Sequence, residues 1–361
     1  MGLIKKIIVR HKLKKKFHQI FRKKIENSKN IILLEFGSSS FNHIASAYLC
    51  DIISKKFKAK IYAYPGYQLL SNKLNLNITS NLKWFLGNIF SLGTFGVHHS
   101  FGVDKIFWPK INRKIEEQAL KKFDYYNNDI SSKEDLENYT IDNILIGDLI
   151  YDSYLKKNLL PTIDIKSNDF KIFFLDSLKL FYYWKSYFKV NQIKAVVLYH
   201  SVYVSAITLR LAIKKKIPCY VFNIERLYRV NKEKKFYGLE YIDYKKKFSQ
   251  FSKKKKTKAI NLASKKMSDR FKGKLSNDIV YLSRSAYRKK KNFRIINKSK
   301  NLKILIAPHS FSDSPHCYGN NFFTDHFEWL EFLGQVSNLS NYDWYIKCHP
   351  DYTTYFDKTV D

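Results

Sequence analysis

The sequence predicts an α/β fold with parallel sheets in two successive domains, and two observations predict it. Apolar runs of strand length alternate with helix-length segments three times along the chain, at 31–64, 193–222 and 303–348. Such alternation is typical of parallel sheets whose two faces are both covered by helices. The chain has 361 residues, of which 45% are hydrophobic and 16% aromatic, and this is enough for packed cores in two domains of ordinary size.

The first unit has a strand at 31–36, a helix over 41–57 and a second strand at 59–64. Small residues join the first strand to the helix, and backbone N–H groups at a helix N-terminus suit an anion. A serine cap of the helix is the alternative interpretation of this loop. His43, in the first turn of the helix, is a candidate base. The anion-binding candidates are Gly37, Ser38 and Ser39.

The second unit has a strand at 193–199, a helix that ends near 215 and a strand at 217–222. His200 directly follows the first of these strands. Ligands of open α/β sheets bind outside the carboxyl ends of the strands, so His200 is a candidate substrate residue. A structural histidine that only hydrogen-bonds its neighbours is the alternative.

The third unit follows a strand at 303–307 with a long polar loop, a helix over 327–339 and a strand at 343–348. Two prolines restrict the backbone of this loop, and we expect it to bind a ligand. A loop without a binding role is the alternative. The histidines, aspartate and cysteine of the loop lack the compact spacing of zinc ligands, so we expect no metal. The polar side chains of the loop are His309, Asp313, His316, Asn320 and Asn321.

The composition divides the chain into four segments. Residues 1–30 are basic with apolar positions among the lysines, which suits either a helix on an anionic membrane or a helix packed on the first domain. Residues 31–230 form the N-terminal domain, and the lysine-rich residues 231–300 form a helical or loop bridge. Residues 301–361 supply only two strands and one helix. We therefore expect the second domain to be incomplete within this chain, and this form to be inactive.

The last predicted strand ends in Lys347-Cys348-His349-Pro350. Because side chains alternate along a strand, Lys347 and His349 point to one face, where they suit the phosphate of a leaving group. This element resembles the K-x-H-P element of bacterial capsule polysaccharide biosynthesis proteins, and it is similar to the H-P motif of bacterial sialyltransferases. The polar loop of the third unit and the segment 144–158 also resemble parts of these capsule proteins.

The resemblance implies a GT-B-type glycosyltransferase, in which two Rossmann-like domains face each other across a cleft. It implies that the N-terminal domain binds the acceptor and that the second domain binds a CMP-, CDP-, UDP- or GDP-linked sugar. No other cofactor is implied. The donor-binding residues that the resemblance implies are His309, Asp313, His316, Asn320, Lys347, His349 and Pro350.

Sugar transfer needs a base that deprotonates the acceptor hydroxyl and positive groups that stabilise the leaving phosphate. The acidic-acidic-Gly motif that carries the base in sialyltransferases is missing from this sequence, as is their later Ser-rich donor motif. The candidate bases are therefore Asp148, His200 and His43. Asp148 and Asp152 equally suit carboxylates at the start of a helix.

The formal net charge is +34, which indicates an anionic partner. Only ten of the 65 basic residues are Arg, so the codon bias of an AT-rich genome explains part of this charge. An anionic inner-membrane surface remains a predicted partner. Four cysteines without a CxxC pair, and the absence of any long apolar run, predict a cytoplasmic protein that binds the inner membrane face peripherally.

Three other functions stay open. Enzymes that transfer glycerol phosphate from CDP-glycerol share the GT-B plan, and a sugar-nucleotide epimerase would have a similar fold. The charge, with 26 Tyr and 28 Phe, also fits a non-enzymatic protein that binds RNA or anionic membrane. The sequence carries no RNP-like or KH-like signature, which argues against nucleic acid as a partner.

Overall fold

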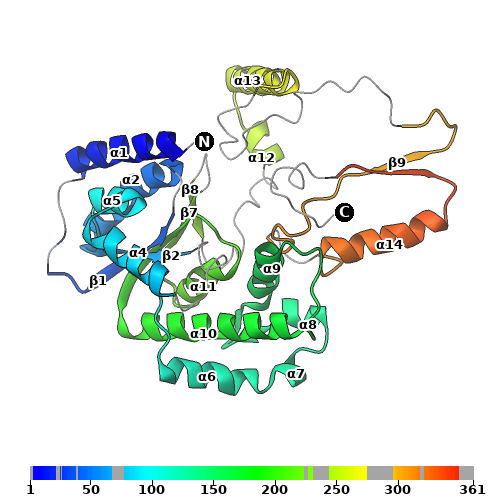
Figure 1. The fold of residues 1–361 in the computed structure, drawn as a ribbon. Helices are drawn as coiled ribbons and strands as arrows, with labels where there is room; N and C mark the ends of the chain where they lie inside the picture. The colour runs from blue at the N-terminus through cyan, green and yellow to red at the C-terminus, as the bar shows by residue number, and fades with distance from the viewer. Residues whose placement is uncertain are drawn as a thin grey trace.

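The computed structural model describes residues 3–21, 25, 27–37, 40–66, 77–222, 227–230, 244–274, 296–317 and 321–348. Its centre is a six-stranded sheet in the order β3-β2-β1-β6-β7-β8 (Figure 1). The first five strands in this order are parallel, and β8 runs antiparallel to β7. The strands are β1 Asn30–Phe36, β2 Lys60–Pro65, β3 Val103–Ile106, β6 Gln192–Leu198, β7 Cys219–Phe222 and β8 Leu227–Val230.

Side chains alternate along β1 and so feed two separate cores. Ile32 and Leu34 pack under the first group of helices, whereas Ile31 and Leu33 pack under the second group. Strands buried on both faces account for the nearly continuous apolar run that predicted them. The first group is α1 Leu3–Ile20, α2 Ser40–Phe57 and α5 Gly93–Ser100, and the second is α9 Gly147–Asn158, α10 Asn168–Val190 and α11 Ile207–Lys214.

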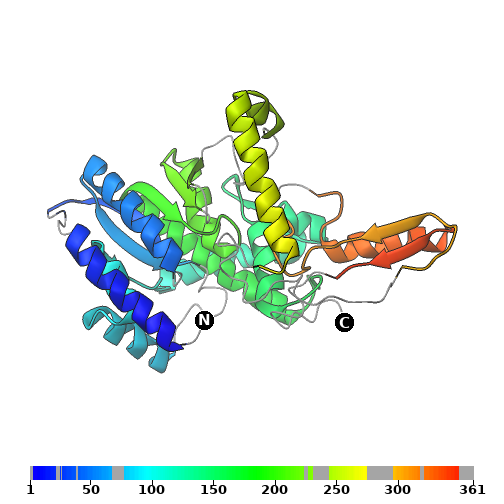
Figure 2. The same cartoon turned by 90° about the horizontal axis from the view of Figure 1, so that it is seen from above.

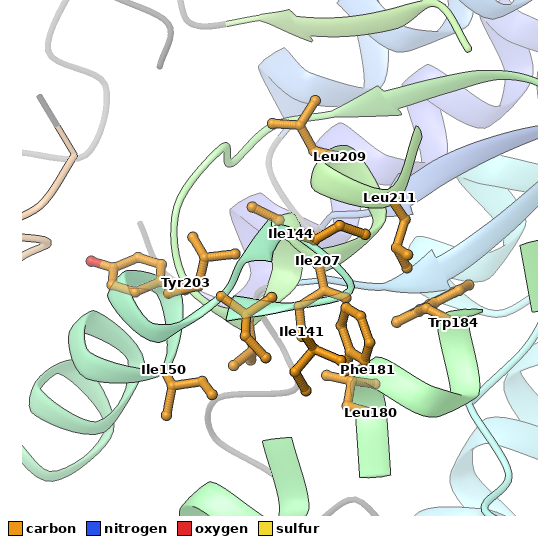
Figure 3. Close-up of a cluster of buried hydrophobic side chains, with 14 of the residues drawn as sticks. Ile141, Ile144, Ile150, Leu180, Phe181, Trp184, Tyr203, Ile207, Leu209 and Leu211 are labelled. Atoms are coloured by element: carbon orange, nitrogen blue, oxygen red, sulfur yellow. The ribbon is translucent and has the colours of Figure 1, made fainter. Parts of the chain in front are cut away.

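Aromatic and branched side chains fill the second of these cores. Trp184 and Phe181 of α10 pack there with Ile207 and Leu211 of α11 (Figure 3). The same core reaches the short ribbon of β4 Thr140–Ile141 and β5 Ile144–Leu145. The 310-helix η1 Val204–Ala206 and α11 occupy the place of the single helix predicted after His200.

Helix α1 packs on the first domain through Leu13 and Phe17, which are buried. Its other end leaves Ile4, Ile7 and Ile8 exposed. The structure thus shows the predicted packing of this helix on the first domain, and its predicted contact with an anionic membrane stays a prediction. No helix within the described residues is both long enough and apolar enough to cross a bilayer.

Of the remaining helices described here, α4 packs on α5, α6 packs on α10 and α8 packs on α9. Helix α13 projects away from the central sheet, and none of its residues is buried (Figure 2). These helices are α4 Ile78–Ile89, α6 Arg113–Phe123, α7 Tyr126–Asp129, α8 Lys133–Glu137, α12 Tyr244–Ser249 and α13 Lys253–Phe271.

The third unit forms a separate two-stranded parallel sheet of β9 Lys303–Ile306 and β10 Asp343–Ile346, joined by α14 His326–Asn338. It projects from the side of the molecule opposite α1 (Figure 2). Leu305 and Ile346 remain exposed in this small sheet. All three predicted units thus form, and the predicted α/β class with a mostly parallel, Rossmann-like sheet is confirmed.

Candidate functional site

The candidate site lies where the order of the central sheet reverses. From β1 the chain proceeds through β2 to β3 on one side, whereas β6 begins the strands on the other side. Such a reversal leaves a crevice outside the carboxyl ends of the two central strands, and ligands of open α/β sheets bind there. The residues at these ends are Glu35, Phe36 and Gly37 after β1, and Tyr199 and His200 after β6.

Glu35 and His200 form a carboxylate–imidazole pair at this point. His200 Nδ1 lies 3.1 Å from Glu35 Oε1, and the backbone N–H groups of Tyr199 and His200 donate to Oε2 at 2.7 and 3.1 Å. Glu35 is buried, whereas the His200 side chain is 36% exposed. A carboxylate that accepts the Nδ1–H leaves the proton-accepting lone pair on Nε2, the tautomer that a general base requires.

The charge on Glu35 is stabilised by its donors. Burial alone would raise the pKa of this carboxyl, but His200 and the two backbone N–H groups outweigh burial and lower the pKa below its ordinary value. Glu35 is therefore ionised at neutral pH, and it can stabilise an imidazolium on His200 once that residue has taken a proton.

Two glycines allow the backbone to pack closely against Glu35 and Tyr199. A Cβ on Gly66, after β2, would lie 2.1 Å from Glu35 Oε1. A Cβ on Gly37 would lie 2.4 Å from the ring of Tyr199. Both contacts are far shorter than any real Cβ contact, so the positions of Glu35 and Tyr199 depend on glycine at 37 and 66.

His43 sits behind the β1–α2 turn. It donates from Nε2 to the carbonyl of Gly37 at 2.8 Å, and His98 of α5 donates to the same oxygen at 3.2 Å. Burial, with Arg10 nearby, lowers the pKa of His43 to about 4, and burial lowers that of His98 well below its usual value. Both rings are neutral and buried, so they hold the carbonyl of Gly37 in place, and the accessible imidazole of this group is that of His200.

The loop after β9 docks onto α9 through buried charges. His316 Nδ1 lies 2.6 Å from Asp152 Oδ1, and its Nε2 lies 3.3 Å from Glu137 at the end of α8. Burial would lower the pKa of His316, but these two carboxylates and Asp148 raise it to about 10. A protonated His316 thus joins the third unit to the first domain at neutral pH.

Asp313 in the same loop connects this contact to the β6 loop. Its Oδ1 accepts from Lys156 at 3.0 Å and from the Tyr203 hydroxyl at 2.7 Å. Tyr203 lies three residues after His200 and has a φ of +62°, an unusual value for a non-glycine residue. The strained loop of Tyr203 therefore carries the general-base candidate at one end and the docking contact at the other.

Asp148 in the first turn of α9 pairs with Arg210 of α11. The Arg210 Nη2 lies 2.6 Å from Asp148 Oδ2, and both side chains are buried. Arg210 also donates to the carbonyl of Leu145 at 3.0 Å. A buried carboxylate that is occupied by a guanidinium lies away from any acceptor hydroxyl, so its position favours a structural role over that of the base.

The predicted donor-binding residues are only partly brought together. His309 is exposed at the start of the loop, and Lys347 is exposed directly after β10. The backbone N–H of Lys347 donates to Ile306 at 2.8 Å, so this residue still continues the parallel pairing. Five of the predicted site residues lie outside the described residues, and they are Ser38, Ser39, Asn320, His349 and Pro350.

Several residues of the site escape sequence reasoning. Glu35 is the clearest of them, and one signal could have revealed it, because a lone carboxylate stands near the end of the otherwise apolar strand IILLEF. Asp152, named only as a helix-start carboxylate, and Glu137 carry no comparable signal, since their partner His316 is more than 160 residues away along the chain. Within the described part of the chain, no cluster of three His, Cys, Asp or Glu side chains is placed to hold a metal.

Comparisons of the chain with protein-family models, with curated proteins and with solved structures find no match in any of the three. The chemistry of the chain must therefore be inferred from its own residues. Those residues form a carboxylate–imidazole pair at the switch point of the sheet, and a buried ionic contact that holds the loop of the third unit against the same domain.

Proposed function

We propose that the chain is a GT-B-type glycosyltransferase that moves a sugar from a nucleotide-sugar donor to a hydroxyl of a surface polysaccharide or lipid-linked glycan. The observation that carries the proposal is the Glu35–His200 pair at the carboxyl ends of β1 and β6. The pair provides a half-exposed imidazole with a fixed tautomer, which is what deprotonation of an acceptor hydroxyl needs.

In this proposal His200 Nε2 takes the proton of the acceptor hydroxyl as its oxygen attacks the anomeric carbon of the donor. Glu35 holds the ring through Nδ1 and stabilises the imidazolium that forms. The bond between the sugar and the nucleotide phosphate breaks, and the phosphate leaves with the bonding electrons. Lys347 and His349 are the proposed cations for this phosphate, because both follow β10 in the K-x-H-P element.

A binder of polyanions is the second candidate, and helix α13 is the observation that favours it. Lys253, Lys254 and Lys258 line one hollow on this exposed helix. Clustered lysines bind the phosphates of RNA in a strongly salt-dependent manner. The Glu35–His200 pair has no evident role in such a protein, because it is a half-exposed imidazole with a buried carboxylate rather than a basic surface.

The test is consumption of CMP-, CDP-, UDP- and GDP-linked sugars and of CDP-glycerol by protein that carries a complete second domain, with released nucleotide and product measured together. We expect one donor class to be consumed, and product mass to distinguish transfer of a sugar from transfer of glycerol phosphate. Interconversion of a free nucleotide sugar without an acceptor would instead identify an epimerase. A folded chain that consumes no donor and binds RNA with strong salt dependence would contradict the proposal and support the polyanion binder.

A further inference from the structure

Helix α4 presents its most apolar face to solvent. Four of its large apolar side chains recur at spacings of four, three and four residues, which places them on one face of the helix. All four are exposed, by 86%, 54%, 60% and 57% in chain order. These exposed residues are Ile78, Leu82, Phe85 and Ile89.

The opposite face of α4 is the one that packs on the protein. The Trp84 ring meets Phe36 at 5.4 Å and Phe95 at 5.2 Å between ring centroids. Gly87 approaches α5 so closely that a Cβ there would lie 2.5 Å from the ring of Phe95. The helix is therefore firmly seated with its apolar stripe outward, the reverse of an ordinary surface helix.

The two helices nearest to α4 lack acidic residues, and one of them, α1, is strongly basic. Helices α1 and α4 both pack on α5, and Lys14 of α1 donates to the carbonyl of Ser91 in the α4–α5 turn. None of the three helices contains an Asp or Glu. Ile4, Ile7 and Ile8 of α1 are exposed as well. The cations of α1 are Lys5, Lys6, Arg10, Lys12, Lys14, Lys15 and Lys16.

We propose that α4, with the basic helix α1 beside it, docks the protein on an anionic lipid bilayer, with the α4 stripe buried among the lipid headgroups. Apolar residues on one face, flanked by lysines without carboxylates, match the chemistry of an anionic membrane interface. A second copy of the chain fits poorly as the occupant, because each copy carries a net charge of +34 and would repel the other.

The docked face lies next to the candidate site. Trp84 on the inner side of α4 contacts Phe36, and Phe36 directly follows Glu35. A bilayer seated on α4 would therefore lie on the side of the domain that carries the carboxyl end of β1. Vesicle binding is nevertheless expected whether or not the chain transfers sugars, so failure of one proposal leaves the other standing.

The experiment is cosedimentation of the full chain with vesicles of phosphatidylcholine alone, or with a third of the lipid replaced by phosphatidylglycerol. We expect binding to the anionic vesicles that weakens as salt is added. The variant Leu82→Glu/Phe85→Glu should bind about 100-fold more weakly, because two apolar anchors are lost. The matched control is Ile172→Glu/Val190→Glu on α10, where side chains exposed by 63% and 76% receive the same charge change and binding should change little.

A second measurement places the helix in the lipid. Phe85→Trp should be quenched by brominated lipids, and Ile172→Trp on α10 should not. Equal loss of binding in both glutamate variants, or no binding by the folded wild type, would overturn the proposal. A wild-type dimer that the α4 variant converts to a monomer, without vesicle binding, would also overturn it and assign the stripe to a second copy.

Discussion

Gly66 matters at the residue scale because Glu35 occupies the space that a side chain at 66 would need. Gly66→Ala should destabilise the protein by about 1–3 kcal/mol through overpacking, and it should displace the carboxylate from His200. The free energy of unfolding in urea measures this effect. The matched control is Gly334→Ala in α14, where a Cβ meets no atom within 4 Å. That substitution should be neutral or stabilising by up to about 1 kcal/mol, and equal losses at both glycines would refute the assigned role of Gly66.

A second prediction at the scale of single residues concerns the ion pair of His316. Removing one partner of a buried ion pair leaves the other charge uncompensated, so His316→Ala should cost about 3 kcal/mol. The exposed His309→Ala should change stability by less than about 0.5 kcal/mol. Urea unfolding of both variants measures the difference.

The pKa of His316 also determines how the free energy of unfolding should depend on pH. Its pKa rises from 6.5 to about 10 on folding, so its contribution is fully present below pH 6.5 and is lost as pH rises through about 10. The wild type should therefore lose stability across this window by more than His316→Ala does. Parallel pH profiles for the two proteins would show that His316 is not charged in the folded state.

At the element scale, α14 is tied to the first domain through its own N-cap. Asp325 Oδ1 accepts from the backbone N–H groups of Phe327 and Glu328, both at 3.0 Å. Its Oδ2 accepts from the hydroxyls of Tyr151 at 2.5 Å and Thr162 at 2.6 Å. One buried carboxylate thus starts a helix and holds that helix against another domain.

Asp325→Ala should therefore cost more than the loss of an ordinary cap. An ordinary cap contributes about 1 kcal/mol. This substitution also removes the acceptor of one buried hydroxyl and one partly buried hydroxyl, so we expect a loss of about 3 kcal/mol in urea unfolding. Asn112 provides the control, because it caps α6 by accepting only from Ile115. If Asp325→Ala and Asn112→Ala cost the same, the contact with Tyr151 and Thr162 contributes nothing.

Elements could be predicted from the sequence where one local signal decided them. The run IILLEF predicts the bounds of β1 to within one residue. Helix α2 begins one residue before its predicted start. The apolar residues of 78–89 carry an equally clear helical period, yet the period does not tell which face is buried. Trp84 and Gly87 decide it through contacts with Phe36 and Phe95, and such tertiary contacts are invisible to a local pattern.

At the scale of the whole molecule, the docking of the third unit was beyond prediction. The place of Asp313 and His316 in a polar loop after a strand predicts ligand binding, and the resemblance implies that the ligand is the donor. The structure pairs them with Lys156 and Asp152 of α9, more than 150 residues earlier in the chain. Nothing in either local sequence identifies the partner. Their predicted contact with a donor remains to be tested.

The arrangement of the two units nevertheless suits the proposed reaction. The loop of Tyr203 leaves the strand end that bears His200 and reaches Asp313 in the third unit. The binding of a ligand to this loop would therefore depend on contacts in both the first domain and the third unit. Nucleotide binding and the integrity of the Tyr203–Asp313 bond should be coupled for this reason.

The most direct test of the central claim compares donor binding and turnover in wild type, His200→Gln and Glu35→Gln, each prepared with a complete second domain. If His200 is the base and Glu35 orients it, both variants should bind the donor nucleotide as tightly as wild type in calorimetry. They should lose about 10²–10⁴-fold in kcat, with the loss in Glu35→Gln the smaller. Unchanged kcat in a folded His200→Gln would contradict the account, as would a folded wild type that binds none of CMP, CDP, UDP and GDP.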